Sequence, residues 1–184
     1  MLSENTRSEG TLRGDAVRDK AVQDKAVREG NLLASTLQWI EANGFNPADI
    51  NAPGNHHDTP LILACRRGER AIAEELMAAG ADINHRNMDG TTALWACVVS
   101  DSVQLARLLL DRGADIDHQN DNGATTLMYA ASAGKTGWVE FFLENGADIR
   151  LQSLDDFTAL DLASNIECLR LLKAARGNTV KKAS

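Results

Sequence analysis

The sequence predicts an all-α solenoid, in which helix-turn-helix units joined by β-hairpin-like turns stack along one axis. The main observation is a repeat: the segment Gly-Ala-Asp-Ile occupies residues 80–83, 113–116 and 146–149, at steps of 33 residues. A threonine followed two residues later by leucine recurs at the same interval, beginning at Thr59 and Thr92. Aromatic residues make up only 4% of the chain, which indicates an aliphatic core. Landmarks that share one period predict stacked structural units.

Each unit is expected to open with a short helix. In the first complete unit, Thr59 is a residue type that caps helix N-termini, and Pro60 follows at the position where a missing N–H costs nothing. Ala64 and Cys65 are small, so a neighbouring helix can approach this one closely. Gly68 then ends the helix, because glycine adopts the left-handed conformation without strain.

A second helix is expected to complete the unit. Ile72 and Leu76 lie four residues apart, with Met77 beside them, so their side chains share one face of a helix. Gly80 supplies the left-handed residue that ends it. Neither helix can bury its apolar face alone, and we therefore expect each unit to be stabilised by stacking on the next.

These units resemble the ankyrin repeat family, in which Gly-x-Thr-Pro-Leu-His-x-Ala-Ala opens a helix pair and Leu-Leu-x-x-Gly-Ala-Asp-x-Asn closes it. Residues 108–117 match the closing pattern almost completely. The resemblance implies an ankyrin-repeat solenoid with three full repeats and degenerate capping units. The expected boundaries are 1–14 for a flexible N-terminal arm, 15–53 for a degenerate capping repeat, 54–86, 87–119 and 120–152 for full repeats, 153–175 for a shortened C-terminal capping repeat, and 176–184 for a basic tail.

The capping units carry the least regular patterns. In the first, Leu33, Leu37 and Ile40 are expected to form the apolar stripe of a second helix, and residues 15–29 are expected to form a polar capping helix. In the last, the leucines of the second helix arrive about three residues early, which we interpret as a trimmed turn between the two helices.

Three positions depart from the family pattern at turns. The turn glycine is present at Gly90 and Gly123 but is replaced by His57 and Asp156, and those two turns are expected to differ in shape. Asp101 stands where a glycine ends the first helix in other units. Aspartate tolerates the left-handed conformation better than most residues, so this exchange should preserve the helix end.

Composition and charge bound the function. The formal net charge is −7, and residues 31–172 carry 20 acidic and 9 basic residues. Such a field repels phosphate backbones, so we expect no nucleic-acid partner. The N-terminus lacks the apolar stretch of a secretory signal, and no apolar run is long enough to span a membrane. We therefore expect a cytoplasmic chain without a membrane partner. We also expect the chain to be monomeric on its own. Cys65, Cys97 and Cys168 stand singly in apolar runs, which is typical of buried reduced thiols.

The residue pattern gives little support for a catalytic site or a metal site. His85 and His118 are equivalent positions in neighbouring units, too far apart to share one metal ion comfortably, and His56 and His57 lie together in a turn that would need a third ligand. No nucleophile has a base and an orienting group at a recurring spacing. We therefore expect no enzyme, no metal and no cofactor. A small-ligand or metal receptor that uses Trp95, Tyr129 and the loop histidines is the alternative, and an uncharacterised hydrolase is a third reading.

Two of the three tryptophans are expected to pack in the hydrophobic core. Trp39 and Trp138 fall at inward positions of second helices, whereas Trp95 replaces the histidine of the family pattern and is expected to be half-buried.

The resemblance implies a non-catalytic module that binds a protein through a concave groove formed by turn tips and first-helix surfaces. The partner-binding residues expected from the family positions are Asn55, His56, Asp58, Arg66, Arg67, Arg86, Met88, Asp89, Thr91, Val99, Ser100, Gln119, Asp121, Asn122, Ser132, Gln152, Leu154, Asp155 and Phe157.

Two features of this set suggest how a partner would be recognised. Arginines gather toward the first repeats and aspartates toward the last, which would orient a partner of the reverse charge order. Met88, Leu154 and Phe157 are apolar at positions expected to face water, and are candidate anchors.

Overall fold

The structure is a computed structural model that describes residues 32–182, with side chains as far as residue 177. The predicted arm at 1–14 and the predicted capping helix at 15–29 lie outside the described residues. The described helices are α2 (Ala34–Ala42), the 3₁₀ turn η1 (Asn55–His57), α3 (Pro60–Arg67), α4 (Arg70–Ala78), α5 (Ala93–Val99), α6 (Val103–Asp111), α7 (Thr126–Ser132), α8 (Thr136–Glu144) and α9 (Ile166–Lys182).

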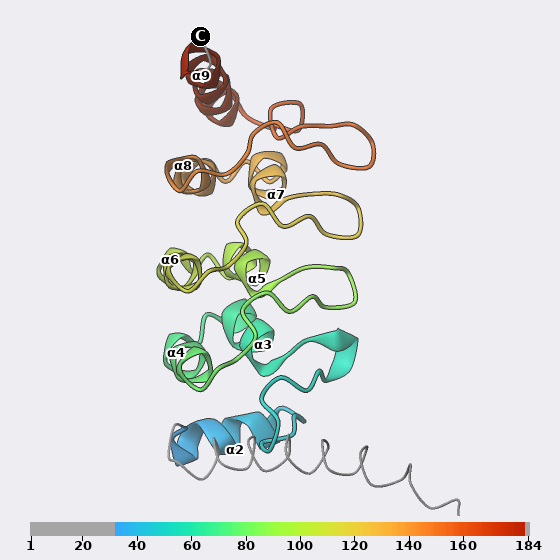
Figure 1. The fold of residues 1–184 in the computed structure, drawn as a ribbon, viewed down its shortest axis with the longest axis vertical. Coiled ribbons are helices and arrows are strands. Elements are labelled where there is room, and N and C mark those ends of the chain that lie inside the picture. The colour runs from blue at the N-terminus through green and yellow to red at the C-terminus, as the bar shows by residue number, and fades with distance from the viewer. Residues whose placement is uncertain (1–31, 183–184) are drawn as a thin grey trace, which may run out of the picture.

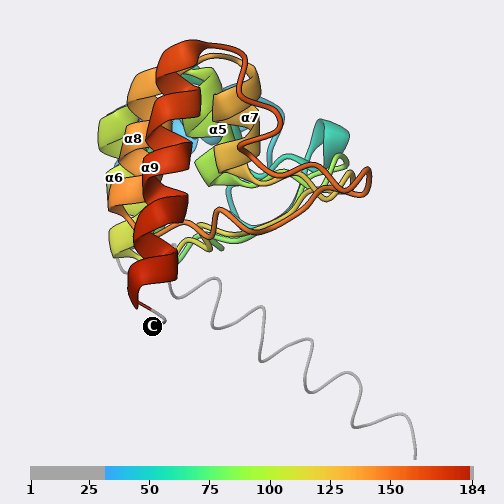
Figure 2. The ribbon, with the colours of Figure 1, turned by 90° about the horizontal axis from the view of Figure 1, so that it is seen from above.

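The helices stack in two columns, and hairpin loops project from one side (Figure 1). The first helices α3, α5 and α7 lie between the hairpins and the second helices α4, α6 and α8. Seen along the stack, the hairpins superimpose (Figure 2). Gln119 and Thr125 form an isolated antiparallel bridge in one hairpin. The predicted all-α solenoid of helix-turn-helix units is confirmed.

The helix ends form as the sequence predicts. The Thr59 hydroxyl accepts a hydrogen bond from the N–H of Ile62, and Pro60 is the first helical residue of α3. Gly68 and Gly80 have φ of 68° and 91°, and Asp101 takes the same left-handed conformation with φ of 58°. The aspartate thus ends α5 in the way that glycine ends the equivalent helix α3.

The core runs through the stack without interruption. Leu76 and Leu109, the inward leucines of α4 and α6, are fully buried, as is Phe142 on α8. Burial of these faces against neighbouring units confirms the predicted source of stability.

All three cysteines are buried free thiols. A hydrogen bond with Cys65, together with burial, raises the pKa of the Cys97 thiol. The expectation of buried reduced cysteines is confirmed for Cys65, Cys97 and Cys168.

A ladder of side-chain hydrogen bonds links successive units on the side of the second-helix ends. In each link, a polar side chain accepts the backbone N–H of the residue 31 positions later, at 2.8–2.9 Å. The ladder consists of Asn51 with Asp82, Asn84 with Asp115, and Asp117 with Asp148. These bonds fix the rotation of each unit on its neighbour.

The N-terminal unit differs from its prediction at one residue. Leu33 precedes the first residue of α2 and is 62% exposed, so it does not belong to the predicted stripe. Its N–H donates to Glu75 Oε2 at 3.1 Å, and the buried Thr36 hydroxyl donates to the same oxygen at 2.6 Å. This bridge to α4 fixes the start of α2 and leaves the Leu33 side chain in solvent. Ile40 is buried as predicted.

The last unit differs more. The predicted trimmed turn between two helices is wrong, because residues 158–163 form turns where the other units have their first helix. Asp161 Oδ2 accepts the N–H and the hydroxyl of Thr158, at 2.9 and 2.6 Å, and Asp161 N–H donates to Thr158 Oγ1 at 3.4 Å. This reciprocal pattern is the capping box of a helix start, yet only turns follow it here. Helix α9 continues to Lys182, across the predicted boundary between the capping repeat and the tail.

None of the helices in the described part of the chain combines the length and the hydropathy that crossing a bilayer requires.

Candidate functional site

Backbone hydrogen bonds join the tips of successive hairpins. The N–H of Met88 donates to His56 O at 2.9 Å, and the N–H of Leu154 donates to Asn122 O at 3.0 Å. Between them, Asp121 N–H donates to Asp89 O at 3.3 Å. We call residues 86–91, 119–124 and 152–157 the hairpin ridge. Its three tips are held in register by the main chain, so the side chains they present are fixed relative to one another.

Glycine is required where one hairpin lies against the next. Gly90 and Gly123 have φ of 72° and 71°. A Cβ at Gly90 would lie 2.7 Å from Asp121 N, and a Cβ at Gly123 would lie 2.8 Å from Leu154 N. Both substitutions would therefore collide with the backbone of the following hairpin.

The two turns without glycine behave differently from each other. Asp156 has φ of 63° and its N–H donates to Ser153 O at 3.0 Å, which reproduces the turn made at Gly90. The expectation that this turn differs in shape is wrong, since aspartate adopts the left-handed conformation here. The turn at His57 does differ: both His56 and His57 have φ of 58°, within η1.

Side-chain amides hold the hairpins from within. Asn87 Oδ1 accepts the N–H groups of Asp89 and Thr91, at 3.1 and 2.9 Å, and also the Thr91 hydroxyl. Asn120 Oδ1 accepts two N–H groups in the next hairpin in the same way. These amide bonds order the two hairpins from within.

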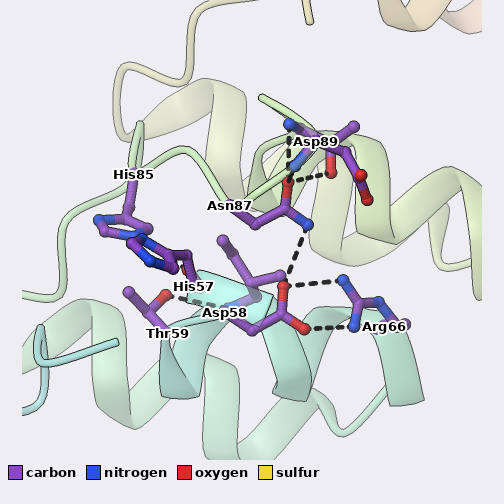
Figure 3. A network of polar contacts seen from close by, with 9 residues as sticks. His57, Asp58, Thr59, Arg66, His85, Asn87 and Asp89 are labelled. Atoms are coloured by element: carbon purple, nitrogen blue, oxygen red, sulfur yellow. Dashed lines mark hydrogen bonds and ion pairs between the residues drawn. The ribbon is translucent and has the colours of Figure 1, made fainter. Parts of the chain in front are cut away.

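Asp58 lies inside the stack, and the expectation that it faces a partner from a turn tip is wrong. It is 5% exposed, and its carboxylate accepts two hydrogen bonds from the Arg66 guanidinium and one, at 3.1 Å, from Asn87 Nδ2 (Figure 3). Asn87 belongs to the following hairpin. Asp58 therefore joins the first two full repeats, and it draws Arg66 toward the stack.

The predicted charge order along the surface is weakened by ion pairs. Arg66 is paired with Asp58, and Arg86 Nη2 lies 2.7 Å from Asp121 Oδ1, across two successive hairpins. Arg67 donates to Asn43 Oδ1 at 2.8 Å. Each of these three arginines thus has an acceptor within the chain, and the ion pairs of Arg66 and Arg86 reduce the positive charge expected at this end.

The loop histidines connect neighbouring units. His85 Nε2 lies 3.1 Å from His57 O, and His118 Nε2 lies 2.7 Å from Gly90 O. Because a carbonyl oxygen can only accept, Nε2 carries a proton in both residues. Each bond fixes the imidazole ring against the preceding hairpin.

Aromatic side chains contact one another at two places in the stack. Trp95 is half-buried, as expected. Its ring stacks on that of Tyr129, with the ring centroids 5.0 Å apart. Trp138 is 3% exposed, and its indole N–H donates to Asp101 Oδ1 at 2.6 Å. Trp39 is partly buried against the core. The sequence could not reveal the Trp138–Asp101 bond, because the two residues belong to different units.

The other predicted partner-binding residues divide by exposure. Ser100 donates to Cys65 O at 2.7 Å and Gln119 donates to Gln152 O at 2.7 Å, so both are engaged between units. Thr91 is half-buried. The exposed members are Asn55, His56, Arg66, Arg67, Arg86, Met88, Asp89, Val99, Asp121, Asn122, Ser132, Gln152, Leu154, Asp155 and Phe157.

A pocket of about 380 Å³ opens beside the last unit, and no pattern in the sequence predicts it. Leu160, Leu172 and Arg176 are among its lining residues, together with Asp161. It lies where residues 158–163 form turns in place of a first helix. The hydrogen bonds that Thr158 donates lower the pKa of Asp161, so this carboxylate is charged.

Comparison with known proteins agrees with this geometry. Residues 24–120 match the family described as ankyrin repeats (3 copies), and residues 109–163 match ankyrin repeats (many copies). A 65-residue stretch, 35% of the chain, is 37% identical to protein fem-1 homolog A-like of Mus musculus. A stretch of the same length is 42% identical to scaffold protein ILK of Homo sapiens and of Mus musculus. The chain covers only 10% and 14% of these relatives' lengths. Since the first family match alone spans more than half of the sequence, and the described units stack as such repeats do, this chain belongs to the ankyrin repeat family.

Proposed function

We propose that this protein is a non-catalytic protein-binding module, an adaptor, inhibitor or scaffold, whose partner occupies the hairpin ridge and the adjoining surfaces of α3, α5 and α7. These are the surfaces that were predicted from the sequence to form a concave groove. One observation carries the proposal. Of the six large apolar side chains that are markedly exposed in the described part of the chain, four lie on this surface: Met88, Val99, Leu154 and Phe157. None of them is part of the buried core that holds the stack together.

The rigidity of the surface supports the same function. The main-chain bonds between tips and the amide bonds within hairpins order the ridge before any partner arrives. A preformed surface loses little conformational entropy on binding, so its contacts convert more fully into affinity. The relatives named scaffold protein ILK are consistent with such a role for a matched repeat segment. The three buried free thiols support a reducing compartment for the complex.

The proposal is tested by site-specific photo-crosslinking. A photoreactive amino acid is placed at Met88 or Leu154 on the ridge, and, as a matched control, at the exposed Glu140 on α8. We expect discrete protein adducts from native lysate at the two ridge positions and none at Glu140. Equal adducts from both faces of the stack would contradict a dedicated binding surface.

Alanine variants supply the second arm of the test. Met88→Ala and Phe157→Ala each remove an exposed side chain, so the thermal unfolding midpoint should stay within about 2 °C of wild type, the range of surface substitutions. Affinity for the crosslinked partner should fall. If both variants bind the partner as well as wild type does, this surface is not the binding site.

A further inference from the structure

The exposed apolar side chains of the hairpin ridge stand in equivalent places of the repeat. Met88 and Leu154 occupy the same turn position in hairpins two units apart, and Asp121 occupies that position in the hairpin between them. The backbone bonds between tips hold this column in register. Phe157, 49% exposed, lies in the same hairpin as Leu154. The ridge thus presents apolar side chains at both ends with a carboxylate between them.

The charged groups on the ridge are mainly acidic. The ridge carries one cation, Arg86, which pairs with Asp121, and four exposed carboxylates, those of Asp89, Asp121, Asp155 and Asp156. Both members of the Arg86–Asp121 pair are more than half exposed, so the pair is weak and either member can exchange it for a group on a partner. The surrounding field has the same sign, since residues 31–172 carry a formal charge of −11.

We propose that the ridge binds a protein segment in which lysine or arginine side chains alternate with aliphatic or aromatic ones. This inference rests on the proposed function and names the class of partner. Apolar side chains of the segment cover Met88, Leu154 and Phe157. Its cations pair with the carboxylates of Asp121 and Asp155, and the acidic field steers its approach.

The charge pattern selects this partner over two others. An acidic segment would bring like charges against the aspartates of the ridge, and a nucleic acid would meet the same repulsion along its phosphates. A purely apolar segment would leave the carboxylates facing apolar surface, which desolvates them without a partner.

The experiment is a selection from a random linear peptide library displayed on phage, with the full chain as immobilised target. We expect enriched sequences to be net positive, with Lys or Arg next to Leu, Ile, Met or Phe. A synthetic peptide of the dominant sequence is then measured by isothermal calorimetry at low and high salt. Leu154→Ser should weaken its binding about tenfold, the effect of one lost anchor.

Charge variants separate the ridge from the general field. Asp155→Asn with Asp156→Asn should weaken binding about three- to tenfold at low salt and reduce its salt dependence. The control removes two charges from exposed positions on second helices, with Asp111→Asn and Glu140→Gln, and should leave affinity nearly unchanged.

The outcomes distinguish this inference from the proposed function. Enriched peptides that are neutral or acidic, yet lose binding in Leu154→Ser, would overturn the inference and leave the binding surface in place. Binding that no ridge variant alters would overturn both. A selection that enriches no sequence above the background of the blank support would also count against both.

Discussion

Asp58→Ala should destabilise the contact between the first two full repeats, although its position in a turn suggests an exposed residue. The substitution removes the acceptor of two hydrogen bonds from Arg66 and one from Asn87 Nδ2. The Arg66 side chain is 39% exposed and can return to water, so the loss of its ion pair costs ~0–1 kcal/mol. Asn87 is 8% exposed, and leaving its N–H unpaired costs ~1–3 kcal/mol.

The two terms together predict a loss of about 1–4 kcal/mol in the free energy of unfolding, or about 3–12 °C in the unfolding midpoint. Urea and thermal unfolding, followed by circular dichroism, measure it.

Asp58→Asn is the matched control, since its amide oxygen can still accept from Asn87, and it should lose only the ion pair, about 1 kcal/mol or less. A double-mutant cycle between Asp58→Ala and Asn87→Ala should show coupling. If Asp58→Ala lies within 0.5 kcal/mol of wild type, roughly the effect of an ordinary surface substitution, the reasoning is refuted.

Four further substitutions test the helix packing, the hairpin turns and one ion pair. Leu109→Ala should cost ~2–5 kcal/mol through a cavity in the core, and unchanged denaturant unfolding would contradict the packing of α6. Gly123→Ala should lower the free energy of unfolding by at least ~1–2 kcal/mol, because its Cβ would meet Leu154 N in a left-handed turn. Asp156→Ala, in the last described hairpin, should cost less than half as much. Equal losses of stability in thermal melts of the two variants would contradict the steric argument. Hydrogen bonds from Arg150 lower the pKa of Asp148 to about 2, so the stability that this carboxylate contributes is full above pH ~4 and is lost as the pH falls toward 2. Asp148→Asn should flatten the dependence of the unfolding midpoint on pH in that window. If the midpoint of the variant falls with acidification as steeply as that of wild type, the contact with Arg150 contributes nothing to stability.

The repeat pattern predicted what depends on residues within one unit. Thr59 and Pro60 start a helix and Gly80 ends one through local chemistry, and the 33-residue period then implies how the apolar faces meet. The same reasoning placed Leu109 in the core. Burial follows directly from such periodicity, since a helix that repeats its apolar stripe must cover it.

Contacts between units were beyond such reasoning. Asp58 was predicted to be a turn-tip residue from its family position, and only the stack brings Arg66 and Asn87 to it. The Trp138–Asp101 bond arises in the same way. Polar partners supplied by the neighbouring unit leave no periodic trace in the sequence.

The last unit shows a different limit. Its spacing suggested a shorter turn between helices, but in the structure turns replace the first helix. The pocket beside Leu172 follows from that replacement, and no motif marks it.

The methionine methyl groups offer the most direct test of the claim that the hairpin ridge is the binding surface. Met88 is 61% exposed on the ridge, whereas Met77 and Met128 are buried in the core, at 7% and 1%. With the methyl carbons labelled, NMR spectra are recorded during titration with the basic peptide selected by display. The account predicts that the Met88 resonance shifts or broadens while the Met77 and Met128 resonances stay in place. A shift at Met77 or Met128 with Met88 unchanged would place binding elsewhere and contradict it.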